Sequence, residues 1–337
     1  MHFFSLFVIG VVVVGLFFDF VNGFHDAANS IATIVATRVM KPWQAVLWAA
    51  FFNFAALFLF GTGVAKTMGA GLIALPYVTP QVVLCGLLGG IVWGLLTWRL
   101  GLPTSSSHAL MGGYAGAAMA NSVVQNGWSM INAPIIAAGW IKVVAFIVIA
   151  PVLGMVLAHG LMGALGFAAR RGLAADGLFY RRAQLVSSAF LSLMHGSNDA
   201  QKTAGIITGA MVAAGALHDF VVPGWVLAAS YAVMGLGTLA GGWRIVRTMG
   251  HRLTLLHPQG GVCAEGASAL SILAATFLGL PVSTTHVTTG AILGVGVARD
   301  ASRVRWGVAR RIAWGWILTI PAAGFVGAAA MVMMSSL

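Results

Sequence analysis

Long apolar runs separated by short polar segments dominate this chain. Eight runs approach or exceed the roughly 20 residues that a membrane-spanning helix needs; they lie near 3–24, 43–65, 81–100, 134–168, 184–215, 220–243, 263–280 and 307–335. Shorter apolar pieces near 26–39, 102–121 and 281–298 are interrupted by polar phrases. Because the alternating period of lipid-exposed strands is absent, the pattern predicts an all-α polytopic membrane protein with about 10–12 membrane segments.

Two polar phrases of this sequence each occur twice. Gly-Leu-Pro-Thr-Ser-Ser-Ser-His at 101–108 returns as Gly-Leu-Pro-Val-Ser-Thr-Thr-His at 279–286, 178 positions later. Asn-Gly-Phe-His-Asp-Ala-Ala-Asn at 22–29 returns as His-Gly-Ser-Asn-Asp-Ala-Gln-Lys at 195–202, 173 positions later. The chain is therefore an internal duplication. Matched positions at the first offset also include Cys85 with Cys263, Gly112 with Gly290 and Gly116 with Gly294; we interpret the two cysteines as small packing residues.

The composition excludes a soluble protein, since 59% of the 337 residues are hydrophobic and 7% are charged. The net charge of +11 comes largely from basic residues in the connections between apolar runs, which indicates membrane topology and not a nucleic-acid partner. Such connections face the cytoplasm, whereas the uncharged connection 122–133 and the weakly charged one at 66–80 are expected outside. The basic connecting residues are Arg38, Lys41, Arg170, Arg171, Arg181, Arg182, Arg244, Arg247, Arg252, Arg299, Arg303, Arg305, Arg310 and Arg311.

This charge distribution gives the two halves opposite orientations. We predict an inverted-topology repeat with broken helices or re-entrant hairpins, as in many secondary transporters. The expected domains are a first repeat at 1–168, a short basic cytoplasmic linker at 169–183 and a second repeat at 184–337. The first 20 residues lack a basic n-region and an Ala-x-Ala cleavage site, so they are expected to form the first membrane helix, with the N-terminus outside the cytoplasmic membrane.

The hydroxyl-rich phrases have the chemistry of an oxyanion site. In each copy a proline ends one apolar run and Ser or Thr residues supply N-caps for the next helix. A helix that begins in the middle of the membrane aims unpaired N–H groups and a partial positive charge at the gap. The predicted anion-binding hydroxyls are Thr104, Ser105, Ser106, Ser107, Ser283, Thr284 and Thr285. His108 and His286 end the phrases and are candidates for orienting a hydroxyl or titrating, beside a purely structural role.

Asp26 and Asp199 occupy matching positions within apolar runs, where a charged residue costs roughly 2.5–3.5 kcal/mol. Carboxylates beside amide oxygens suit Na⁺, and a carboxylate alone suits H⁺. Gly23 and Gly196 precede the two acids and permit a helix break. An ion pair of Asp199 with Lys202 is the alternative reading. The polar neighbours expected near the coupling ion or the substrate are Asn22, His25, Asn29, Asn198 and Gln201.

Two further acids lie in or beside apolar runs. Asp19 is a candidate packing or interfacial acid. Glu265 has Leu87 as its counterpart in the first half, so it breaks the symmetry, and both a protonation site and a lone structural acid remain open.

Together, the four phrases resemble those of the inorganic phosphate transporter family, which includes bacterial low-affinity phosphate uptake proteins and eukaryotic sodium–phosphate cotransporters. The resemblance spans nearly the whole chain. It implies an inverted-repeat transporter in which the hydroxyl phrases bind phosphate and the Asp phrases bind the coupling ion or help to hold the substrate. His25 stands where many members have Asn, and there the chain resembles the bacterial proton-coupled type.

The favoured function is symport of inorganic phosphate with H⁺ or Na⁺ across the cytoplasmic membrane, without a cofactor and without enzyme activity. A sulfate or other oxyanion permease of the same fold is the first alternative. An intramembrane hydrolase that uses Asp26 with Asp199, or Ser106 with His108, is the second. The expected partners are the lipid bilayer and phosphate, either free or as a metal–phosphate complex, and a homodimer is also compatible with the sequence.

Overall fold

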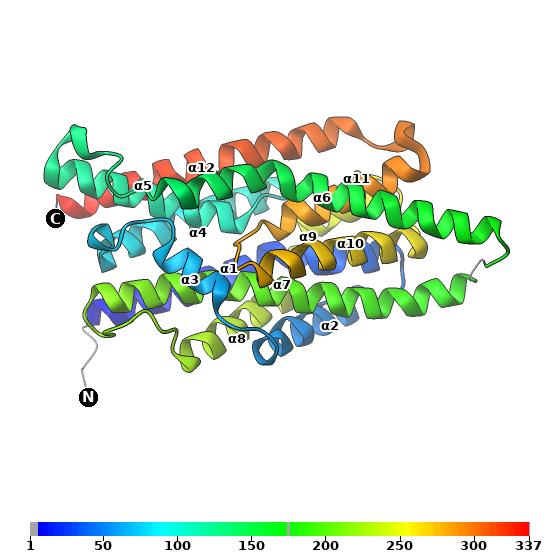
Figure 1. Ribbon diagram of the computed structural model, residues 1–337, viewed down its shortest axis with the longest axis horizontal. Coiled ribbons are helices and arrows are strands. Elements are labelled where there is room, and N and C mark those ends of the chain that lie inside the picture. The colour runs from blue at the N-terminus through cyan, green and yellow to red at the C-terminus, as the bar shows by residue number, and fades with distance from the viewer. Residues whose placement is uncertain (1–5, 174–175, 337) are drawn as a thin grey trace.

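The computed structural model describes residues 6–173 and 176–336, and these residues form two sets of six α-helices (Figure 1). The first set is α1 (Leu6–Ala36), α2 (Pro42–Ala55), α3 (Gly63–Ala70), α4 (Pro80–Leu100), α5 (Ser106–Asn126) and α6 (Ala137–Arg170). The second set is α7 (Gly177–Ala213), α8 (Gly224–Ala240), α9 (Trp243–Arg247), α10 (Pro258–Phe277), α11 (Thr284–Asp300) and α12 (Trp306–Ser335). Short helical turns η1 (Ala56–Phe58), η2 (Leu75–Tyr77), η3 (Trp128–Met130), η4 (Thr248–Arg252) and η5 (Ala301–Arg303) join them.

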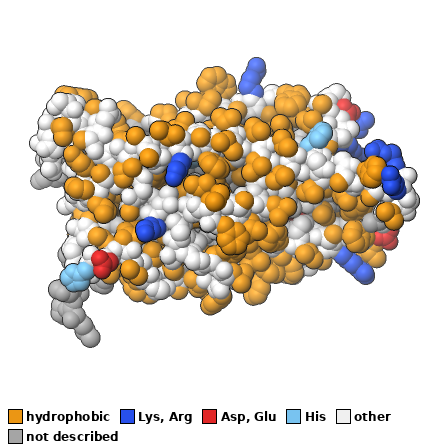
Figure 2. Space-filling view, in the orientation of Figure 1, with side chains coloured by type: hydrophobic (Ala, Val, Ile, Leu, Met, Phe, Trp, Pro, Cys, Tyr) orange, Lys and Arg blue, Asp and Glu red, His pale blue; other side chains and the backbone are white. Residues whose placement is uncertain are grey.

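The helices and the surface both fit a bilayer. By length and composition, five helices of the described residues can cross a membrane, and the number rises to seven if each of two bent pairs is one span. The long helices run along the long axis of the molecule (Figure 1). Hydrophobic side chains cover much of the visible face, and basic side chains gather at the end where α6 meets α7 (Figure 2). The start of α1 and the end of α12 lie at the opposite end (Figure 1).

Helix packing follows the duplication. Helix α1 packs on α8 as α7 packs on α2, and α5 packs on α12 as α11 packs on α6. Each pairing joins one helix of the first set to one of the second, so the two halves interlock. Cys85 and Cys263 are buried in two different clusters of the apolar core, as their interpretation as packing residues requires.

Helices α1 and α7 pass through Gly23 and Gly196 without a break, which differs from the discontinuity that these glycines permit. The glycines serve close packing instead. A Cβ on Gly23 would overlap the backbone of Met234 in α8, and one on Gly196 would overlap the backbone of Asn53 in α2. The two carboxylates therefore project from continuous helices.

The actual breaks lie elsewhere. The segment α2–η1 meets α3 at 86°, and α8 meets the α9–η4 segment at 60°. The chain also turns between α4 and α5 and between α10 and α11, at the two hydroxyl-rich phrases. In the predicted linker 169–183, α6 continues to Arg170 and α7 already begins at Gly177, while positions 174–175 lie outside the described residues.

Candidate functional site

The two hydroxyl loops have the same backbone design. Gly101 and Gly279 adopt left-handed conformations, with φ of 63° and 65°, and end the preceding helices. Ser105 and Ser283 are the N-caps of α5 and α11, and each accepts a hydrogen bond from the backbone N–H three residues later, at 3.1 and 3.2 Å. The sequence-based prediction of capped helix starts is confirmed. The remaining hydroxyls are left for other partners.

Asp26 lies against the first hydroxyl loop. Ser106 Oγ donates a 3.1 Å hydrogen bond to Asp26 Oδ1, and His25 Nδ1 lies 2.8 Å from the same oxygen. The other ring nitrogen of His25 contacts Thr97 Oγ1 at 3.2 Å and Thr104 Oγ1 at 3.5 Å. His25 thus connects the carboxylate to the last turn of α4.

Asp199 lies against the second hydroxyl loop in the equivalent way. Thr284 Oγ1 donates a 3.2 Å hydrogen bond to Asp199 Oδ2. Lys202 Nζ forms an ion pair with Asp199 Oδ1 at 2.6 Å, and His195 Nε2 lies 3.3 Å from Oδ2. The ion pair named as the alternative reading of Asp199 is therefore present, but it is one of several contacts of this carboxylate.

Each helix motif also reaches the hydroxyl loop of the other half. Asn29 Nδ2 donates to Thr284 Oγ1 at 3.2 Å and to Thr285 Oγ1 at 3.0 Å. In return, Lys202 Nζ donates to Ser107 Oγ at 2.5 Å. Because Asn29 matches Lys202 and Thr285 matches Ser107 in the duplication, these contacts are related by the same pseudo-twofold symmetry.

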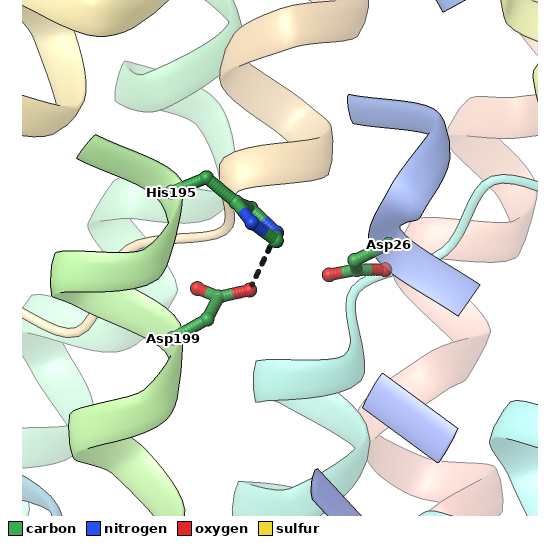
Figure 3. Close-up of side chains that lie close together, drawn as sticks. All are labelled: Asp26, His195 and Asp199. Atoms are coloured by element: carbon green, nitrogen blue, oxygen red, sulfur yellow. Dashed lines mark ion pairs between the residues drawn. The ribbon is translucent and has the colours of Figure 1, made fainter. Parts of the chain in front are cut away.

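The two halves meet at a cluster of buried ionisable groups (Figure 3). Ligand atoms of Asp26, His195 and Asp199 all lie within 4.8 Å of one another. Asp26 faces the other two from α1, across the gap between α1 and α7 (Figure 3). None of the three side chains is more than 2% exposed. The two carboxylates and the imidazole are suitable ligands for a cation, and they come from both halves of the chain.

Several predicted residues have other roles. Gln201 Oε1 accepts the backbone N–H groups of Val64 and Ala65, so this side chain caps the start of α3 and lies away from the carboxylate cluster. Asn198 Nδ2 donates to Thr276 Oγ1 and to the carbonyl of Leu280, which anchors the second hydroxyl loop. Asn22 is buried, and its Oδ1 has no hydrogen-bond partner within the described residues.

Glu265 belongs to a separate cluster. It accepts hydrogen bonds from Thr33 Oγ1 at 2.6 Å, Gln184 Nε2 at 2.9 Å and Ser187 Oγ. Thr33 follows Asp26 by seven residues on α1, a rise of about 10 Å, which separates this cluster from the paired carboxylates. Asp19 is fully buried rather than interfacial.

His108 and His286 lie side by side at the centre of the duplication. Their ring centroids are 4.9 Å apart, and the His286 ring stacks on Trp316 at 4.0 Å. Since the two histidines are matched positions, their contact places them on the pseudo-twofold axis. Both are buried immediately behind the hydroxyl loops, within the first turns of α5 and α11.

The sequence does not predict the roles of three residues of the site. Thr97 lies among the apolar residues of α4, and no sequence pattern marks it as a site residue. His195 matches Asn22 in the duplication and precedes Asp199 by one helical turn, a spacing that identifies it in retrospect. The sequence predicts Lys202 only as a partner of Asp199. In the structure it also donates to the backbone carbonyl of Val282 at 2.6 Å.

A cavity of about 400 Å³ opens beside the second hydroxyl loop. It is lined by Gly279, Leu280 and Pro281 of that loop, and Lys66 and Lys142 also line it. These basic groups give an anion an attractive approach to the loop.

Comparisons with known proteins agree with this architecture. A family model described as "Phosphate transporter family" matches residues 22–176 and 170–327. A probable low-affinity inorganic phosphate transporter of Rhizobium meliloti (strain 1021) is 50% identical and aligns over 95% of this chain and 94% of its own length. One of Bacillus subtilis (strain 168) is 41% identical over 96% of both chains. Among solved structures, "The sodium-dependent phosphate transporter" superposes with a TM-score of 0.84, at 24% identity, over 99% of this chain and 100% of its own.

Proposed function

Because the chain belongs to the phosphate transporter family, we propose that it takes up inorganic phosphate across the cytoplasmic membrane by symport with a cation. Related proteins are named as phosphate transporters or permeases, and the chain is not an enzyme. Ser106 donates to Asp26 and His108 packs on His286, so the Ser106–His108 pair is not formed. Asp199 is ion-paired with Lys202, which differs from an aspartic dyad whose two acids share a proton. The hydrolase alternative is therefore dropped.

The observation that carries this proposal is the meeting of both hydroxyl loops with both carboxylates. Helices α5 and α11 begin at these loops, so their first N–H groups and partial positive charges favour an oxyanion. Ser107 and Thr285 add neutral donors, because they accept hydrogen bonds from Lys202 and Asn29 and keep their own O–H groups. Neutral donors hold an anion without the strong attraction that would prevent its release.

The carboxylates supply the cation coupling in this proposal. Asp26 and Asp199 place negative charge next to the anion, and a cation bound there offsets the charge that phosphate brings into a medium of low dielectric. Either Na⁺ or H⁺ satisfies this requirement. Coupling follows because the anion and the cation each bind better when the other is present.

The same carboxylates favour phosphate over sulfate. Near neutral pH phosphate keeps a proton that sulfate lacks, so a carboxylate accepts a hydrogen bond from phosphate and only repels sulfate. A site that pairs a hydrogen-bonding group rejects an analogue without that group far better than shape does. Alternating access then follows from movement of one set of helices against the other around a fixed site.

Uptake into proteoliposomes tests the proposal. Purified protein is reconstituted, and radiolabelled phosphate uptake is measured with a Na⁺ gradient and a pH gradient imposed separately. We expect accumulation driven by one of the two gradients and weak competition by sulfate. Equal competition by sulfate would favour the oxyanion permease, and Mg²⁺ added to the same assay separates free phosphate from a metal–phosphate complex. Equilibration without accumulation under both gradients contradicts symport.

A further inference from the structure

Lys202 is a fully surrounded ammonium group at the junction of the two halves. Its side chain is 3% exposed. Nζ lies 2.6 Å from Asp199 Oδ1, 2.5 Å from Ser107 Oγ and 2.6 Å from the carbonyl oxygen of Val282. The ammonium therefore has one carboxylate, one hydroxyl and one backbone carbonyl as ligands, and each comes from a different segment of the chain.

This ligand set is the one that proteins use for a hard cation. Carboxylate, hydroxyl and carbonyl oxygens suit Na⁺, and in inverted-repeat transporters such ions bind near the midplane at the repeat interface. A lysine differs from a bound ion because its charge is covalently attached. It cannot leave with the substrate.

The duplication shows what occupies the equivalent position in the first half. There Asn29 matches Lys202, and its neutral amide donates to Thr284 and Thr285. The surrounding contacts are conserved between the halves: Ser106 donates to Asp26 as Thr284 donates to Asp199. One half of a symmetric site is therefore neutralised from within the chain, and the other is not.

The charge balance of the two carboxylates differs accordingly. Asp199 has the ammonium of Lys202 in direct contact. Among the described residues, the ion-pair partner of Asp26 is His25 alone, which carries charge only when it is protonated. A buried carboxylate without a fixed positive partner needs a proton or a cation from solution.

We propose that Lys202 is a built-in cation that fills the cation position of the second half. The chain then binds its coupling cation only in the first half, at Asp26, and Lys202→Asn opens a second, Na⁺-selective position at Asp199. This inference rests on the proposed function for its consequence in transport, but not for its test. The residue thereby sets how many cations from solution accompany each phosphate.

Thermal unfolding of the detergent-solubilised full chain, without phosphate, tests the new site. Lys202→Asn gives the second half the residue that Asn29 provides in the first. Titration with NaCl against KCl at constant ionic strength should raise the Tm of Lys202→Asn by about 2 °C beyond any rise in the wild type, at Na⁺ ten times the apparent Kd. Lys202→Arg keeps the charge and Lys202→Met fills the space without an oxygen ligand, so neither should gain this response.

Results from the Lys202 variants and from the wild type can each contradict the inference. A monodisperse Lys202→Asn protein with no added Na⁺ response overturns it, as does an equal gain in Lys202→Met. Equilibrium binding of ²²Na⁺ to the wild-type chain should saturate at no more than one ion per chain. Two bound ions overturn the inference even if every Lys202 variant fails to fold. Failure of the proposed function is distinct, since it appears as absent phosphate uptake by wild-type proteoliposomes.

Discussion

Carboxylate oxygens of Asp26 and Asp199 lie within 4.8 Å of each other, although 173 residues separate them in the chain. Each acid accepts a hydroxyl hydrogen bond from the loop of its own half, and a matched neighbour of each reaches the loop of the other half. The proposed anion site and the proposed cation site therefore share one set of contacts, built around the pseudo-twofold axis. This relationship explains why both loops and both acids are present in duplicate.

Neutralising either acid should uncouple transport. We expect Asp26→Asn and Asp199→Asn to abolish concentrative phosphate uptake. Asp26→Asn removes the charge that attracts the coupling cation, and Asp199→Asn leaves the Lys202 ammonium unpaired beside the cation position. At least one of them should also narrow the preference for phosphate over sulfate, measured by exchange across proteoliposomes. Accumulation at the wild-type level in both variants would remove the carboxylates from the mechanism.

The two acids should differ in their effect on stability. Asp199→Asn leaves the buried Lys202 ammonium without its partner, and breaking a buried pair in this way costs about 3–5 kcal/mol. Asp26→Asn leaves no buried lysine without a partner, so it should lower the free energy of unfolding by a smaller amount. Unfolding in detergent measures both, and Asp199→Asn combined with Lys202→Met should recover most of the loss. An equal effect of the two single variants would contradict the asymmetry between the halves.

Hydroxyls whose own O–H group is not used within the protein should contribute to phosphate affinity. These are Ser107 and Thr285, which accept hydrogen bonds from Lys202 and Asn29. A buried oxyanion that loses one charge-assisted hydrogen bond loses roughly 1.5–3 kcal/mol, which corresponds to a rise in KM of about 10-fold to 100-fold. We expect this rise for Ser107→Ala and Thr285→Ala in initial-rate uptake assays. Cys263→Ala, which alters a buried side chain of the apolar core, is the matched control. Wild-type KM in both hydroxyl variants would show that the loops do not bind the anion.

Matched glycines hold the helices behind the loops in close contact. A Cβ on Gly112 would overlap the carbonyl oxygen of Ile320, and one on Gly290 would overlap that of Pro151. Gly112→Ala and Gly290→Ala should therefore each destabilise the fold by about 1–3 kcal/mol. Gly160→Ala, where no atom of the described residues lies within 4 Å of the new Cβ, is the control and should be neutral or stabilising. Equal Tm values for all three variants would contradict the packing.

The inverted orientation can be measured by cysteine labelling. In a Cys85→Ala, Cys263→Ala background, Ser129→Cys should react with a membrane-impermeant maleimide added to intact cells. Arg171→Cys should react only after the cells are opened, because the connection between α6 and α7 is rich in basic residues, which favour the cytoplasmic side. Labelling of position 171 from outside would reverse the predicted topology.

Local features of this protein were predictable from its sequence. The duplication is visible as repeated sequence motifs. Ser105 and Ser283 are identifiable as N-caps because a cap depends on residues three positions apart. The ends of the preceding helices at Gly101 and Gly279 follow from glycine's access to positive φ. The membrane helices are likewise predictable from single apolar runs, and their orientation is predicted from the arginines of single connections.

Contacts between distant segments were decided only by the tertiary structure. Gly23 and Gly196 looked like helix breakers, but each is required for contact with a neighbouring helix, and sequence does not reveal which backbone lies opposite. Gln201 caps α3 rather than joining the carboxylates, because the bend before α3 brings that helix start to α7. Lys202 reaches Ser107, 95 residues away, only because the repeats interlock. A side chain's partner across such a distance depends on how whole helices pack, and that is a property of the assembled bundle.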